Sequence, residues 1–188
     1  MTNKQVSKIS MGGETSSEQA VRGAIQMHSK RVWRFGLALS GASDVADDLL
    51  QSTCLRALER HHQVTSYDRL DSWLITICRS IWLNEVRARS VRKAQALSVT
   101  PEAELIATGP DAETNIFAAE VFTQVMQLAE AQRETVMLVF VEGYSYREAA
   151  ALLEVPIGTI MSRLSNARQK LKTVMQHEAA DAVRRSGK

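Results

Sequence analysis

The chain has 188 residues with a formal net charge of +2, and 45% of its residues are hydrophobic. These values are ordinary for a globular protein of one or two small domains, and so small a net charge identifies no class of partner. No segment approaches 18 consecutive apolar residues and the N-terminus lacks a signal peptide, so we expect no membrane insertion. With 3 prolines, 9 glycines and 5% aromatic residues, the composition favours helix. We expect an all-α protein of the cytoplasm.

Two helical patterns follow a polar N-terminal segment. Residues 1–15 lack periodicity, so we expect them to be disordered. The first helix ends at Gly41, and Ser43 is a candidate N-cap for the second. Apolar pairs then recur every four residues from Val45 to Leu58, which predicts an amphipathic helix. The opposite face of this second helix is polar.

A third helix is predicted to begin at Asp71 or Ser72 and to run to about residue 89. Its apolar face includes Trp73, which we assign to the core. Its polar face and the side chains beside it are Thr76, Arg79, Ser80, Trp82, Asn84 and Arg87. An aromatic ring among basic and small polar groups is how proteins hold unstacked bases, with stacking worth roughly 1–3 kcal/mol per base. Trp82 fits a core position equally well, so the pattern leaves both interpretations open.

A stretch without helical periodicity divides the chain. Residues 90–113 contain Pro101, Gly109 and Pro110, which predicts a linker. We therefore expect a disordered segment over residues 1–15, a helical domain over 16–92, a linker over 93–113, a second helical domain over 114–175 and a C-terminal tail over 176–188. Whether that tail extends the last helix stays open.

The second domain carries a helix-turn-helix pattern. An apolar stripe ends at Gly143, and its last members are Val136, Met137, Phe140 and Val141. Ser145 and Glu148 then have the spacing of a capping box. After a short break, Pro156 opens a last helix, where its missing N–H would lack a helical partner anyway. Two short helices joined by a tight turn are typical of DNA-binding domains, although helical hairpins are also common elsewhere.

The last helix is predicted to present a hydrogen-bonding surface. Four polar residues fall at positions i, i+3, i+4 and i+7 and so share one side: Thr159, Ser162, Arg163 and Asn166. Arg168 and Lys170 extend the positive surface. Such side chains suit base edges and phosphates in a major groove. A merely solvated face is the alternative interpretation.

Charge and chemistry elsewhere give no indication of catalysis. Basic residues gather after Arg79 and again after Met161, which suggests two places that meet phosphate, although solvated faces have the same pattern. Cys54 and Cys78 sit among apolar neighbours, which indicates buried thiols in a reducing compartment. The histidines and cysteines lie in no metal-ligand spacing. We therefore predict no catalytic residue, no metal site and no cofactor.

Four segments together resemble a known family. DVADDLLQSTCLRALER, over residues 44–60, resembles the second conserved helix of extracytoplasmic-function (ECF) sigma factors. LDSWLITICRSIWLNEVRAR, over residues 70–89, resembles their promoter-melting and −10-reading segment. QRE at 132–134 and EGYSYREAAALLEVPIGTIMSRLSNARQKL at 142–171 are similar to their −35-reading helix-turn-helix. The segments also stand in the family's order.

The resemblance implies partners and roles for particular residues. It implies an RNA polymerase core bound through the β′ clamp helices and the β flap, promoter DNA, and a cognate anti-sigma factor. The clamp-helix contact would be made by Asp47, Asp48, Leu49, Gln51 and Leu55. The −10 element would be read by Arg79, Ser80, Trp82, Asn84 and Arg87. The −35 element would be read by Thr159, Ser162, Arg163, Asn166, Arg168 and Lys170.

Some positions depart from the family pattern. Ser80 stands where many members have Asn, which leaves the −10 base preference open. Ser165 and Asn166 replace a more usual pair that ends in arginine, so we expect fewer phosphate contacts at the −35 element.

Two other classes of function are alternatives to a sigma factor. A sigma mimic would bind an anti-sigma factor without starting transcription, but it would not need the Ser162-Arg163 segment. A simple helix-turn-helix repressor would leave the first domain without a role.

Overall fold

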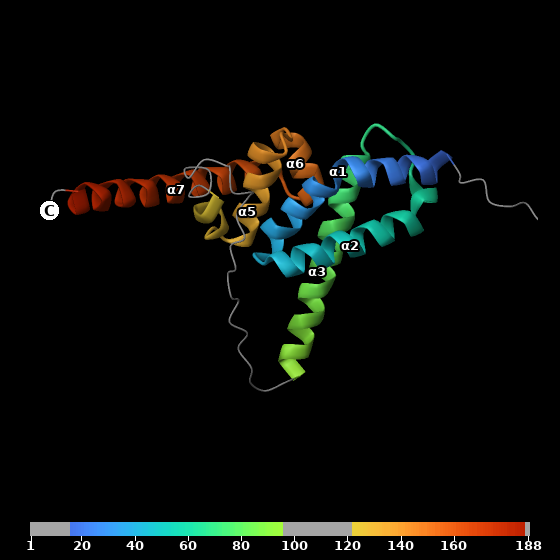
Figure 1. The fold of residues 1–188 in the computed structure, drawn as a ribbon, viewed down its shortest axis with the longest axis horizontal. Coiled ribbons are helices and arrows are strands. Elements are labelled where there is room, and N and C mark those ends of the chain that lie inside the picture. Colours follow the sequence, from blue (N-terminus) through green and yellow to red (C-terminus); the bar gives the residue numbers. More distant parts are fainter. Residues whose placement is uncertain (1–15, 96–121, 187–188) are drawn as a thin grey trace, which may run out of the picture.

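The computed structural model describes the backbone of residues 16–95 and 122–186, and the side chains of residues 16–92 and 122–172. The predicted N-terminal segment, and the predicted linker beyond residue 95, lie outside this range. The described part contains helices and no strand, which confirms the all-α prediction. The elements in chain order are α1 (Ser16–Ser40), α2 (Ser43–Glu59), η1 (His61–Gln63), α3 (Leu70–Gln95), α5 (Glu130–Val136), η2 (Met137–Val141), α6 (Tyr146–Leu153) and α7 (Ile157–Ser186) (Figure 1). Residues 122–126 are also helical.

The first domain is built from α1, α2 and α3. Gly41 follows α1 with a φ of +79°, a left-handed conformation that lets the chain reverse into α2. The two helices approach closely, since a Cβ placed on Gly36 would lie 3.5 Å from the backbone of Ala46. Each of the three helices contributes nearly inaccessible side chains to the shared core, among them Phe35, Leu49 and Leu74.

Two helix boundaries differ from the sequence prediction. The N-cap of α2 is Ala42 and not Ser43, and no side chain caps its first turn. The loop is organised from the preceding helix instead, because Ser40 Oγ accepts the Ala42 N–H at 3.2 Å and donates to the Gly36 carbonyl at 2.9 Å. α3 extends to Gln95, further than predicted.

A π-helical segment, η2, follows α5 and changes which side chains are buried. Its hydrogen bonds span five residues, as between the Glu142 N–H and the Met137 carbonyl at 2.9 Å, so each turn holds an extra residue. Met137 is 3% exposed, whereas Phe140 and Val141 are 58% and 49% exposed. The predicted apolar stripe is therefore wrong at these two positions, because the wider turn rotates them away from the core.

α6 and α7 form the predicted helix-turn-helix. The capping box is confirmed: the Glu148 N–H donates to Ser145 Oγ at 3.3 Å, and the Ser145 N–H donates to Glu148 Oε2 at 2.9 Å. Glu154 ends α6 with a left-handed φ of 54°, and Pro156 stands directly before α7. α7 continues as a helix to Ser186, through most of the region predicted as a tail.

The second domain packs directly against the first. Val125, Leu128 and Val136 belong to the same buried cluster as Phe35 and Leu74. Beyond this shared centre, α7 and the C-terminal part of α3 extend outward in different directions (Figure 1). The sequence pattern predicts two domains but gives no indication that they share a core.

Arg133 connects the two domains at the ends of helices. Its guanidinium donates to the carbonyls of Ala38 and Leu39 in the last turn of α1. It also donates to the carbonyls of Met126 and Leu128, which close the helical segment before α5. The last carbonyls of a helix lack helical partners and carry its negative dipole end, so one buried cation caps two helices. Burial lowers the pKa of Arg133.

The two cysteines differ in accessibility. Cys78 is completely buried, and burial raises the pKa of its thiol to about 12. Cys54 is only partly buried, and burial raises the pKa of its thiol as well. Neither is an activated thiolate. The prediction of a buried thiol agrees with Cys78 and is wrong for Cys54, which is only partly buried.

Iodoacetamide at pH 8 is expected to label Cys54 first and to leave Cys78 unlabelled until the chain unfolds. With a pKa of about 12, only about one Cys78 side chain in ten thousand is ionised at that pH. Intact mass and peptide mapping measure the labelling, and Cys54→Ser is the control that should stay unlabelled while folded. Labelling of Cys78 at the same rate in native and urea-unfolded protein would contradict its burial.

Candidate nucleic-acid interface and polymerase-binding face

The outer side of α2 presents an acidic face with one apolar residue. Asp47, Asp48 and Gln51 are exposed, and Leu55 is 61% exposed although it is a large aliphatic side chain. Asp47 also accepts the indole N–H of Trp33 at 2.7 Å, which fixes its carboxylate beside α1. These four residues lie within about two and a half turns on one side of the helix. An exposed leucine among acids suits a contact with a partner surface.

Leu49 does not belong to this outer face. It is 1% exposed and lies in the core of the first domain. Leu49 follows Val45 by four residues and precedes the buried Thr53 by four, so it shares their inward side, and this spacing is why the apolar pairs recur every four residues. Of the five residues that the resemblance assigns to polymerase, four are therefore accessible, and Leu49 supports them from within.

The polar side of α3 borders a groove of about 200 Å³. Ser80, Asn84 and Arg87 line it as the pattern predicts, together with Thr76, Arg79 and Leu83. Asn84 and Arg87 are exposed and bonded to each other, with Arg87 Nη1 donating to Asn84 Oδ1 at 3.3 Å. The far wall of the groove comes from the second domain, through Leu152 and Glu154.

Trp82 is buried between the domains. Only 6% of it is exposed, and its indole N–H donates to Glu130 Oε1 on α5 at 2.7 Å. The guanidinium of Arg89 lies over its ring, 5.7 Å from the centroid. The sequence leaves open whether Trp82 lies in the core or on a base-stacking face, and in this structure it lies in the core.

Glu134 holds one arginine from each predicted DNA-reading element. Its Oε2 accepts Arg79 Nε of α3 at 3.4 Å, and its Oε1 accepts Arg163 Nη1 of α7 at 3.2 Å. Its side chain is 7% exposed. Burial raises the pKa of the Glu134 carboxyl, against the opposing pull of the two guanidinium groups. The sequence gives no indication of this role, because the three residues come from three separate helices.

The exposed face of α7 differs in part from the predicted set. Ser162 and Asn166 are exposed as expected, but Arg163 is mostly turned inward, with its side chain 21% exposed and paired to Glu134. Arg163 follows the buried Ile160 by three residues and precedes the buried Ala167 by four, so it flanks the inward stripe. Thr159 is likewise half-buried.

Two exposed positions on this face were not among the predicted residues. Met161 is 51% exposed and Ser165 is also exposed, so both stand beside Ser162 and Asn166. The sequence could have indicated Ser165, because it lies opposite the apolar stripe of the same helix. No comparable signal marks an exposed methionine.

The two basic residues at the far end of this face are accessible. Arg168 lies over the ring of Phe140 at 5.8 Å and donates to the Tyr146 hydroxyl at 3.1 Å. Lys170 is exposed beyond it. The outer face of α7 therefore offers hydroxyl, amide and cationic groups along three turns, as a major groove requires.

Comparison with known proteins decides the family. The protein family described as "Sigma-70 region 2" matches residues 24–92, and the family described as "Sigma-70, region 4" matches residues 119–171. The ECF RNA polymerase sigma factor EcfG of Rhodopseudomonas palustris is 33% identical over 147 residues, which span 78% of this chain and 80% of that protein. The chain belongs to the ECF sigma factors. It is a transcription initiation factor that binds RNA polymerase core and directs it to promoters, and its family is a non-enzymatic one.

Further relatives extend over more of this sigma factor. The ECF sigma factor SigC of Mycobacterium tuberculosis is 31% identical over 169 residues, which cover 90% of each chain. The sigma factor RpoE from Bartonella quintana, solved in complex with the anti-sigma factor NepR, has a TM-score of 0.72 at 28% identity and covers 82% of this chain and 96% of its own. These matches confirm the predicted family.

Within the described residues, no helix has the length and apolarity needed to cross a membrane. The same residues contain no group of three or more His, Cys, Asp or Glu side chains that could hold a metal ion.

Arg163→Ala is expected to lower the stability of this sigma factor by about 2 kcal/mol, because it takes one of two charged partners from a buried carboxylate. Asn166→Ala should leave stability within about 0.5 kcal/mol, since Asn166 is exposed. Urea unfolding followed by circular dichroism measures both. Equal midpoints for the two variants would mean that Arg163 does not support the fold.

Proposed function

We propose that this sigma factor divides its work among three surfaces. The outer face of α2, made of Asp47, Asp48, Gln51 and Leu55, binds the clamp helices of the polymerase β′ subunit. The groove face of α3, with Ser80, Asn84 and Arg87 flanked by Arg79 and Trp82, engages the −10 element as it opens. The outer face of α7, with Ser162, Ser165, Asn166, Arg168 and Lys170, lies in the major groove of the −35 element.

One observation supports this division most directly. The exposed hydrogen-bonding side chains of α7 follow a capped helix and a tight turn, and they lie on a different helix from the exposed acidic face of α2. Acidic residues on the α2 face would repel phosphate, whereas the amide and cationic groups on α7 would attract it. The opposite chemistry of the two faces fits a protein partner on α2 and DNA on α7.

Promoter opening on this proposal requires no chemical step by the chain. Bases that leave the duplex are held by stacking and hydrogen bonds on α3, which offsets an unpairing cost of a few kcal/mol for each flipped base. We accordingly propose that the chain has no enzymatic activity and works in the cytoplasm, where polymerase is found. We also propose a cognate anti-sigma factor, on the strength of the relative solved with NepR.

A reconstituted run-off assay tests the proposal as a whole. Purified chain and bacterial core polymerase are incubated with a library of promoter fragments. Transcripts that depend on the chain and share a −35/−10 pair are the expected result. Core binding without any transcript would favour a sigma-like mimic, and duplex binding by the chain without core binding would favour a simple repressor.

Leu55→Ala is expected to weaken binding to core polymerase by about tenfold, because it removes the apolar centre of the α2 face. Fluorescence anisotropy of labelled chain titrated with core measures the affinity. Met27→Ala is the matched control, since Met27 is another large exposed side chain, 77% exposed, on the neighbouring helix α1. Equal losses in the two variants would remove the α2 face from the proposal.

Asn166→Ala is expected to reduce transcription from promoters that depend on the −35 element by about tenfold, since a good contact to a base edge contributes about 1–3 kcal/mol. Core binding should be unchanged. Asn84→Ala is the reciprocal control: it should impair opening at the −10 element without changing preference at −35. Loss of core binding by Asn166→Ala would contradict the separation of the surfaces.

A further inference from the structure

Met161 is an apolar side chain on the outer face of α7, among groups that form hydrogen bonds. It is 51% exposed. Among the described residues it belongs to neither buried cluster, and it is not one of the partly buried side chains packed against them. The packing of the second domain therefore does not account for it. Single apolar residues are ordinary on protein surfaces, so its role depends on where it stands and on what surrounds it.

The residues around Met161 are small, so its side chain projects beyond them. Gly158 precedes it by three residues on the same side of the helix, and a Cβ placed there would meet no atom within 4 Å. Ser162 and Ser165 are exposed beside it, with side chains two heavy atoms shorter than that of methionine. Any surface that approaches this side of α7 meets the thioether of Met161 first.

The place of Met161 along α7 suits a contact with bases. In a helix-turn-helix, the N-terminal residues of the second helix contact base edges in the major groove. α7 begins at Ile157, four residues before Met161. From Met161 to Asn166 the helix rises about 7.5 Å, which is roughly two base pairs at 3.4 Å each. The thioether would thus lie within a base pair or two of the bases that Ser162 and Asn166 reach.

The chemistry of the thioether selects one group in the major groove. Methionine has no hydrogen-bond donor and only a weak acceptor, so it is a poor match for the polar edges of the bases. The C5-methyl group of thymine is the apolar feature of that groove, and apolar side chains recognise it by direct contact. Removing one methyl-sized group from water corresponds to about a fourfold change in affinity.

Ser162 supplies a complementary acceptor next to Met161. Its hydroxyl donates to the Thr159 carbonyl at 3.0 Å, so its proton is used within the helix and its oxygen can accept from a partner. In the major groove, the amino groups of adenine and cytosine are the donors, and of these two bases adenine pairs with thymine. The neighbouring acceptor and thioether therefore match the amino and methyl groups of an A·T pair.

On the basis of the function proposed above, we propose that Met161 is a specificity-determining residue that selects a thymine in the −35 element by contact with its C5-methyl group. Hydrogen bonds from Ser162 and Asn166 to neighbouring base edges hold α7 in the groove. The methyl contact then distinguishes thymine from the other bases at one position. The −35 element of this sigma factor accordingly contains a thymine whose methyl group contributes to recognition.

Replacing thymine with deoxyuridine tests this contact, because the change removes the methyl group and keeps the base pair. A promoter recovered from the run-off library is prepared with each thymine of its −35 element, on either strand, replaced in turn. Run-off transcription at limiting chain and excess core is measured on each template. For the wild type we expect one position at which the replacement lowers transcription by about fourfold. Met161→Ala should transcribe the thymine and deoxyuridine templates equally.

Met27→Ala is the matched control, since Met27 is 77% exposed on α1, away from the α7 face, and this variant should keep the fourfold ratio. Met161→Leu should restore the ratio, because leucine also offers apolar surface. Met161→Gln takes the place of Met161→Ala should the latter fail to fold by circular dichroism.

Three results would overturn the role of Met161 and leave the proposed function intact: a −35 element without thymine, a wild type insensitive at every position, or a ratio that persists in Met161→Ala. A wild type that yields no transcript with excess core would refute the proposed function, and the thymine contact with it.

Discussion

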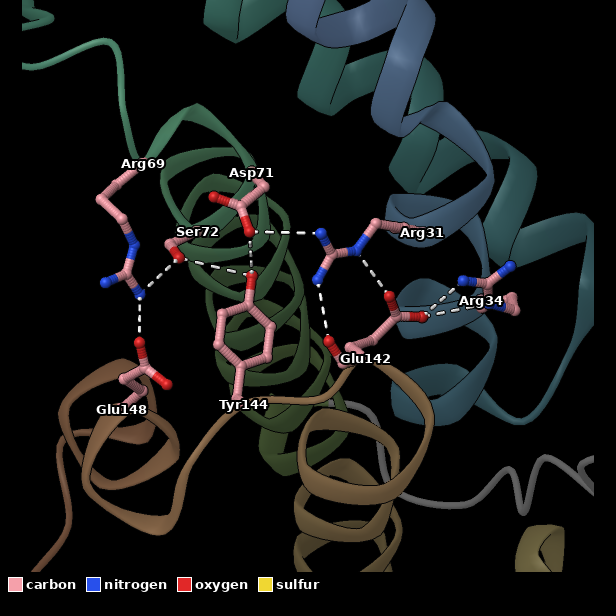
Figure 2. Close-up of polar contacts among 8 residues, drawn as sticks. All are labelled: Arg31, Arg34, Arg69, Asp71, Ser72, Glu142, Tyr144 and Glu148. Atoms are coloured by element: carbon pink, nitrogen blue, oxygen red, sulfur yellow. Dashed lines mark hydrogen bonds and ion pairs between the residues drawn. The ribbon is translucent and has the colours of Figure 1, made fainter.

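A carboxylate removed from water must be neutralised and hydrogen-bonded, and the arrangement of the two domains depends on how Glu134 and Glu142 satisfy that constraint. The Glu142 side chain is 2% exposed and takes both of its partners, Arg31 and Arg34, from α1 (Figure 2), so it has no neutralising group unless the domains are docked. Glu134 takes one partner from α3 and one from α7, so half of its neutralisation lies within its own domain. Separation of the domains therefore affects the two residues unequally. Glu142 loses every cation that it binds, whereas Glu134 keeps Arg163.

Arg133 supplies the complementary interaction at the same interface. Its guanidinium is bound by neutral carbonyls at the ends of helices, and these carbonyls belong to both domains. A cation in such a place is stabilised by the partial negative charge of helix C-termini. The apolar cluster beneath it is continuous between the domains, so their docking combines hydrophobic burial with a few directional charged contacts. The directional contacts determine which faces of α3 and α7 approach each other.

The three surfaces proposed for this ECF sigma factor differ in how accessible they are. The α2 face is open, the outer face of α7 is open, and the face of α3 nearest Trp82 is covered. The α3 face proposed to engage the −10 element is thus the one that the second domain covers. The exposed Phe140 and Val141 come from the same π-helical segment that delivers Glu142 to α1, so one local irregularity shapes both the interface and the outer surface.

The sequence by itself determined the helical class, the helix-turn-helix with its capping box, the family, and the exposed residues of α2 and most of those of α7. Those features are local: apolar periodicity, cap spacing and short motifs act over a few residues, and each can be recognised in one segment. Tertiary structure alone decided the burial of Trp82, the inward turn of Arg163 and the pairing of Glu142 with α1. Each depends on groups brought together from distant parts of the chain, as between Arg31 and Glu142, 111 residues apart. Whether a polar side chain faces water or a buried partner is decided by what packs over it, and periodicity within one helix carries no information about that.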